Sequence, residues 1–83
     1  MNDSRKQLQA AADEFGWDRR EGEKWPAGQR LTFSRPDGAR IGVFLDAVGL
    51  VRSAEWRDAG GSNNRINGGA SAVIAALRTH RPR

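Results

Sequence analysis

The sequence predicts an α+β fold of two layers, in which two helices cover one face of an antiparallel three-stranded meander, in the order α-β-β-β-α. Three observations lead to this prediction. The chain has 83 residues, which suits a single domain, residues 1–83. Apolar residues recur at helical spacing near both of its ends. Between these segments, apolar and polar residues alternate with the period of a β-strand.

Residues 4–15 are expected to form the first helix. Apolar side chains from Leu8 to Phe15 recur at helical spacing and make one stripe. Ser4, followed three positions later by Gln7, is typical of a capping box at a helix N-terminus. The stripe predicts that this helix packs on the sheet.

The segment of residues 17–29 is open to two interpretations. Charged residues fill the stretch between Trp17 and Trp25, and Pro26 and Gly28 interrupt regular structure. The segment either contains a short edge strand near one of the tryptophans or has no regular element.

Residues 30–57 are predicted to form the meander. Its first two strands alternate apolar and polar side chains on either side of a strong turn signal, Arg-Pro-Asp-Gly, at residues 35–38. One set of side chains therefore faces the helices and the other faces solvent. The side chains expected in the core of the whole domain are Leu8, Phe15, Leu31, Phe33, Ile41, Val43, Leu45, Trp56, Val73 and Leu77.

The third strand, residues 50–57, has two candidate inward sets. One contains Leu50, Ala54 and Trp56, and the other contains Val51 and its alternates. The first set is favoured because it buries the tryptophan.

The C-terminal part of the chain is expected to be a loop followed by a helix. Glycine and asparagine are frequent in residues 58–69, which predicts irregular backbone. Residues 70–79 are apolar at helical spacing and should form the second helix, and residues 80–83 a basic tail.

The charge of the chain lies at its C-terminal end. The formal net charge is +4, and the acidic and basic side chains of residues 1–58 balance. Residues 59–83 contain no acidic residue, and their arginines are Arg65, Arg78, Arg81 and Arg83. A basic segment attracts nucleic acid, acidic proteins and acidic membrane surfaces alike.

The composition argues against catalysis. The absence of cysteine excludes disulfides, thiolate zinc sites and a cysteine nucleophile, and a single histidine excludes a histidine-rich metal site. His80 is expected to be a solvated residue near a helix C-terminus. The glycine pairs match neither a P-loop nor a dinucleotide fingerprint. We therefore expect no enzyme activity, no cofactor, no metal and no small-molecule substrate.

The sequence shows no targeting segment. Its first nine residues are polar and charged, and its apolar runs are far shorter than the roughly 20 residues needed to span a bilayer. A cytoplasmic location without membrane association is expected.

Phe44 is the most informative single residue. By alternation it points away from Val43 and Leu45, toward the open face of the sheet, where arginines surround it. An aromatic ring among arginines on a sheet is typical of single-strand recognition. Alternatively, the segment around Trp17 and Trp25 covers Phe44, or Phe44 contacts a protein. Trp25, next to Pro26, is expected to be partly exposed.

Two resemblances add to these observations. A helix ending in Phe-Gly-Trp at residues 15–17, a hairpin containing Thr-Phe-Ser-Arg at residues 32–35, Val-Arg-Ser-Ala at residues 51–54, and a Gly-Gly entry to the last helix resemble small α+β proteins of unknown function from actinobacteria and their phages. This resemblance implies an accessory role, often in phage–host interaction, and no chemistry.

The element order is also similar to that of the double-stranded RNA-binding domain. That family carries lysines at the start of its last helix, where they contact phosphates. Residues 67–71, at the matching positions, contain no basic side chain, and only Arg65 lies close. This second resemblance therefore concerns topology alone.

We expect a small, non-enzymatic, phage-encoded accessory protein that binds a host protein or a second copy of itself. The residues expected to bind this partner are Trp25, Arg30, Arg40, Phe44 and Arg57. The alternative is a nucleic-acid-binding module that uses the open sheet face and the C-terminal arginines Arg65, Arg78, Arg81 and Arg83.

Overall fold

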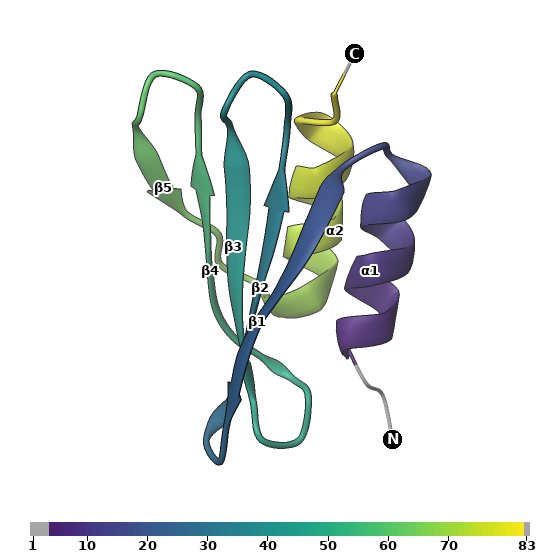
Figure 1. Ribbon diagram of the computed structural model, residues 1–83, viewed down its shortest axis with the longest axis vertical. Helices are drawn as coiled ribbons and strands as arrows, with labels where there is room; N and C mark the ends of the chain where they lie inside the picture. The colour runs from purple at the N-terminus through teal and green to yellow at the C-terminus, as the bar shows by residue number, and fades with distance from the viewer. Residues whose placement is uncertain (1–3, 83) are drawn as a thin grey trace.

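The computed structural model describes residues 4–82, apart from the side chains of residues 21, 23 and 24. Two helices pack on one face of a five-stranded antiparallel sheet whose strand order follows the chain (Figure 1). The elements are α1 (Ser4–Glu14), β1 (Asp18–Trp25), β2 (Gly28–Ser34), β3 (Arg40–Asp46), β4 (Val51–Arg57), β5 (Asn63–Arg65) and α2 (Gly69–Thr79). The α+β class and the meander are confirmed, with five strands where the sequence predicts three.

The first additional strand, β1, lies at one edge of the sheet. Trp25 pairs with Gly28, so Pro26 and Ala27 form a hairpin turn between β1 and β2. Pro26 thus lies in the turn and Gly28 begins β2, whereas the sequence suggests that both residues interrupt regular structure. β1 carries few apolar side chains because backbone pairing with β2, rather than burial, holds it in the sheet.

The second additional strand, β5, corrects the predicted loop of residues 58–69. Its three residues pair with the end of β4, from Glu55 to Arg57. The Asp58 side chain accepts a hydrogen bond from the Ser62 backbone N–H (2.9 Å) and closes the turn before it. A strand of three exposed residues has too few side chains to show any period, so the sequence offers no sign of it.

A β-bulge in β4 turns residues from both candidate inward sets toward the core. Phe44 of β3 lies opposite Ser53, but the next residue, Leu45, lies opposite Val51. The extra residue on β4 changes the alternation, so that Val51 and Ala54 both pack toward the core. Leu50 is exposed, contrary to the favoured set.

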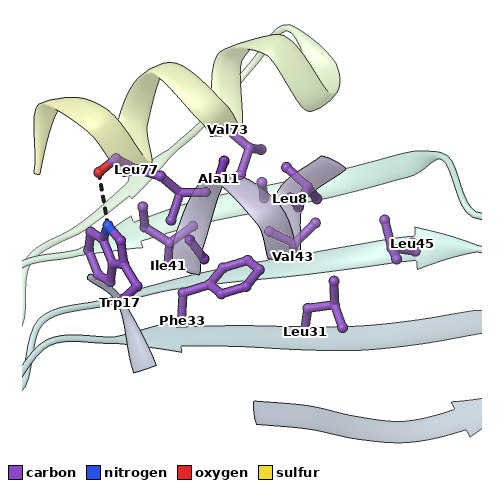
Figure 2. Close-up of a cluster of buried hydrophobic side chains, with 12 residues drawn as sticks. Leu8, Ala11, Trp17, Leu31, Phe33, Ile41, Val43, Leu45, Val73 and Leu77 are labelled. Atoms are coloured by element: carbon purple, nitrogen blue, oxygen red, sulfur yellow. Dashed lines mark hydrogen bonds between the residues drawn. The ribbon is translucent and has the colours of Figure 1, made fainter. Parts of the chain in front are cut away.

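The core lies between the sheet and the two helices (Figure 2). Phe33, Leu8, Leu31, Ile41, Leu77, Val43 and Val73 are its largest fully buried side chains. Trp17, absent from the predicted core, is buried, and its indole N–H donates to the Leu77 carbonyl (2.8 Å). Phe15 and Trp56 were expected in the core but are only partly buried at its border.

The four turns that connect the strands lie at the two ends of the sheet, two at each end. The β1–β2 and β3–β4 turns lie together at one end, and the β2–β3 and β4–β5 turns lie at the other end, near the C-terminal end of α2 (Figure 1). The backbone N–H of Ser4 donates to the Gly49 carbonyl (3.1 Å), which attaches the start of α1 to the β3–β4 turn. The sheet face opposite the helices carries no layer of the described chain, and we call it the open face.

Candidate functional site

The open face is rich in arginine. Residues directly opposite each other in a sheet point to the same side, so the strand register identifies the side chains of this face. Each of the five strands contributes one of its arginines, which are Arg20, Arg30, Arg40, Arg57 and Arg65. Among the side chains that the structure describes, the carboxylates of the same rows are the exposed Asp18 and Glu55 and the half-buried Asp46. Its described arginines outnumber its described carboxylates by five to three, so the face carries a net positive charge.

Two stacked aromatic rings lie at one end of the open face. Trp25 and Phe44 have ring centroids 6.0 Å apart and an interplanar angle of 23°. The Arg30 guanidinium carbon lies 5.5 Å from the centroid of the Phe44 ring. Trp25 keeps 45% and Phe44 40% of its surface exposed, so the stack is accessible to a ligand. We call Trp25, Phe44 and Arg30 the aromatic cluster.

The exposed apolar side chains gather near this cluster. The large exposed hydrophobic residues of the described chain are Trp25, Phe44, Val48 and Leu50. Val48 and Leu50 belong to the β3–β4 turn, and Val48 lines a shallow depression together with Trp25 and Pro26 of the β1–β2 turn. One end of the sheet therefore carries the exposed apolar side chains of the described residues.

Two hollows adjoin the Phe44 ring on the open face. The first has a volume of about 350 Å³, and Trp25, Ala27 and Arg52 are among the residues that line it. The second, of about 200 Å³, lies over Gly42, and we call it the Gly42 hollow. Phe44 and Ser53 line both hollows, so Phe44 stands between them. The residues around the Gly42 hollow are Arg30, Gly42, Phe44, Ser53, Ala54, Glu55, Asn63, Asn64 and Arg65.

The missing side chain of Gly42 creates the second hollow. A Cβ at this position would lie 3.8 Å from Cγ and 3.9 Å from Oε1 of Glu55, so the Glu55 carboxylate reaches over the glycine. Arg65 of β5 lies directly opposite Glu55, yet the two side chains form no ion pair. The Glu55 carboxylate, which can accept hydrogen bonds, and the side chains of Arg30 and Arg65 thus line the same hollow.

The structure divides the residues that the sequence assigns to two alternative sites. Arg65 lies with Arg30 and Phe44 at the Gly42 hollow. Arg78 lies in the helical layer, where its guanidinium is 5.8 Å from the Phe15 ring, and Arg81 donates to the Arg78 carbonyl (3.4 Å). Arg83 lies outside the described residues.

Arg40 and Arg57 occupy the other end of the open face. They lie directly opposite each other on β3 and β4. Like charges in such a pair destabilise a sheet. An anion bound between the two guanidinium groups would remove this cost.

His80 belongs to a separate cluster behind the sheet and differs from the solvated residue that the sequence predicts. Its ring stacks on Trp56 with centroids 4.0 Å apart, and its carbonyl accepts a hydrogen bond from Arg35 (2.9 Å). Arg35 also lies 5.3 Å from the Trp56 ring and pairs with Asp37. Its hydrogen bonds lower the pKa of Asp37 to about 2. This cluster attaches the end of α2 to the β2–β3 turn.

Acidification is expected to weaken the attachment of the C-terminal residues. Burial lowers the pKa of His80 below its ordinary value of 6.5, and the charge of Arg35 lowers it further. The unfolded chain therefore takes up the proton first, so the stabilisation is complete above pH 6.5 and is lost as the pH falls through the folded-state pKa. Urea unfolding above and below this pH should show the loss, and His80→Phe, which can stack without titrating, should show less of it. If the free energy of unfolding falls with pH to the same extent in the unchanged protein and in His80→Phe, His80 does not cause the loss.

The sequence does not indicate how two residues of the open face, Trp25 and Arg65, reach it. Trp25 is partly exposed, as the sequence predicts, and its stacking on Phe44 depends on the β1–β2 hairpin, which the sequence leaves open. Pro26 and Gly28 give a signal for this hairpin, since proline and glycine close together are typical of a turn. Arg65 joins the open face only because β5 pairs with β4.

The described helices include none long and apolar enough to cross a membrane. Among residues 4–82, no group of three or more histidine, cysteine, aspartate or glutamate side chains is arranged to hold a metal ion.

Comparisons with known proteins find no matching family, no similar curated protein and no similar solved structure. The function is therefore argued from the site alone.

Proposed function

We propose that the protein binds single-stranded nucleic acid on the open face of its sheet, in the cytoplasm and without catalysis. The observation that carries this proposal is the exposed stack of Trp25 and Phe44 beside Arg30, on a face where the described arginines outnumber the described carboxylates. Proteins that bind single strands combine aromatic rings, on which bases stack, with a basic surface that follows the phosphates.

The arrangement of charges supports a strand that runs along the face. The arginines extend from the aromatic cluster, past Arg65, to the Arg40–Arg57 pair at the far end of β3 and β4. Phosphates along one strand would neutralise these side chains in turn and relieve the repulsion within that pair.

A single strand suits this face better than a duplex. Bases in a duplex are stacked on each other and cannot reach the rings of a flat sheet, whereas unpaired bases can. The first turn of α2, which begins at Gly69, carries no basic side chain for the phosphates of a double helix.

A binding titration tests the proposal. Fluorescently labelled random single-stranded DNA and RNA should bind at low salt, and the affinity should fall steeply as salt rises, with a logarithmic slope of about −0.7 for each phosphate contacted. Duplex DNA of equal length should bind more weakly. If neither single strand binds at low salt, the proposal is wrong.

Alanine substitution of the two rings should weaken this binding without unfolding the protein. Trp25→Ala and Phe44→Ala each remove a surface on which a base stacks, and such contacts are worth about 1–3 kcal/mol per base, or roughly 5- to 150-fold in affinity. Val48→Ala and Leu50→Ala are matched controls, because these exposed apolar residues lie at the same end but outside the stack. Equal losses in all four variants would show that the stack has no special part.

A protein partner is the second candidate, and the gathering of Trp25, Phe44, Val48 and Leu50 at one end of the sheet favours it. Exposed aromatic residues are frequent anchors of protein interfaces. The partner expected from the sequence, a host protein or a second copy of a phage-encoded accessory protein, stays a prediction. Sedimentation over a range of concentrations tests self-association, which Val48→Ser and Leu50→Ser should then abolish.

A further inference from the structure

The Gly42 hollow is suited to one unpaired nucleobase. Its volume of about 200 Å³ is smaller than the pockets of drug-sized ligands, which begin at about 300 Å³. It opens beside the Phe44 ring, and Gly42 contributes no side chain that would obstruct it. A base that enters it can therefore lie against an aromatic wall while its strand continues over the open face.

Positively charged side chains flank the hollow, and a negatively charged side chain lies inside it. Arg30 and Arg65 flank it, and their charges favour the phosphates on either side of an inserted base. The Glu55 carboxylate lies over Gly42 within the hollow itself. Within the part of the chain that the structure describes, Glu55 has no hydrogen-bond or ion-pair partner. Both of its oxygens are free to accept hydrogen bonds.

A carboxylate that only accepts hydrogen bonds discriminates among the bases. Guanine presents two adjacent donors, N1–H and the N2 amino group, which can bind both carboxylate oxygens in parallel. Adenine and cytosine offer a single amino group on this edge. Uracil offers one N–H between two carbonyl oxygens, which the carboxylate repels.

We propose that the Gly42 hollow binds guanine, with Glu55 accepting from its Watson–Crick edge and Phe44 stacking on the ring. This inference rests on the proposed single-strand binding and adds a base preference to it. It gives a role to Glu55, the carboxylate that lies between Arg30 and Arg65 at the hollow, where phosphate binding alone would disfavour a negative charge.

The experiment uses short labelled uridine strands that differ at one central position. Guanosine at that position should bind roughly tenfold tighter than uridine, since a good bidentate pair discriminates by about 1–3 kcal/mol, that is, about 5- to 150-fold. Inosine, which lacks the N2 amino group, should bind with intermediate affinity.

Two variants separate base recognition from general charge. Glu55→Gln replaces one accepting oxygen with a donor and should abolish the preference for guanosine, while its affinity for the all-uridine strand stays equal or rises. Gly42→Val should fill the hollow and abolish the preference, while binding still weakens as salt rises.

The outcomes are distinguishable. If the protein binds all strands equally, or if Glu55→Gln raises every affinity by the same factor, the guanine site is wrong and single-strand binding stands. If no strand binds at low salt, the proposed function fails and the base preference fails with it.

Discussion

Gly28→Ala is expected to lower the thermal unfolding midpoint by more than about 10 °C and to leave much of the protein unfolded at body temperature. A Cβ at this position would lie 1.8 Å from the Leu45 carbonyl oxygen, and the φ of Gly28, +153°, is one that other residues rarely adopt. Overpacking costs about 1–3 kcal/mol and a strained backbone about as much again. The sum approaches the total stability of about 5 kcal/mol expected for so small a domain, and each kcal/mol shifts the midpoint by about 4–8 °C.

Gly42→Ala is the matched control for this substitution. Gly42 also lies in a strand of the same sheet, but a Cβ there meets only the flexible Glu55 side chain, at 3.8 Å and 3.9 Å. Its stability should be unchanged or slightly higher, because glycine inside a strand is unfavourable. Circular dichroism during heating measures both variants. Equal midpoints would show that β2 and β3 can separate at Gly28 without loss.

Gly28 also connects the fold to the site. It pairs with Trp25 across the β1–β2 hairpin and with Asp46 of β3. The close approach of Gly28 to the Leu45 backbone therefore brings the tip of the hairpin, with Trp25, against the end of β3 that carries Phe44. A side chain at Gly28 would move the two rings apart as well as weaken the sheet.

The central strands of the fold could be predicted from the sequence because burial leaves a period there. Leu31 and Phe33 in β2, like Ile41 and Val43 in β3, are buried and alternate with exposed or half-buried residues, as one buried sheet face requires. β1 and β5 are edge strands held by backbone hydrogen bonds, and their side chains follow no apolar period. The bulge in β4 likewise depends on its pairing with β3, which no local pattern in the sequence indicates.

The candidate site was predictable to the same extent. The direction of Phe44, Arg30 and Arg40 follows from alternation alone and agrees with the strand register. The Gly42 hollow and its Arg65 border depend on β5, and the Trp25–Phe44 stack depends on β1. The open face therefore combines contributions from predicted strands with contributions from strands that the sequence does not indicate.

Reversing the charges of Arg30 and Arg65 is expected to lower the affinity for single strands by roughly 100-fold at about 0.1 M salt. The slope of about −0.7 per phosphate makes each contact worth about fivefold at that salt, and the introduced carboxylates add repulsion. Both side chains lie exposed on the open face and form no ion pair in the described chain, so Arg30→Glu with Arg65→Glu should not unfold the protein.

Arg78→Glu with Arg81→Glu is the matched control, because it changes the net charge by the same amount in the helical layer. Its affinity should fall by only a few-fold, through the long-range field of the whole protein. The double variant on the open face should also make the affinity depend less steeply on salt. The control double variant should leave the slope of this dependence almost unchanged. Equal losses in the two double variants would mean that net charge alone attracts the strand. A larger loss of affinity in the control would show that the C-terminal arginines, and not the open face, bind the strand. The exposed rings of the open face would then indicate a different partner.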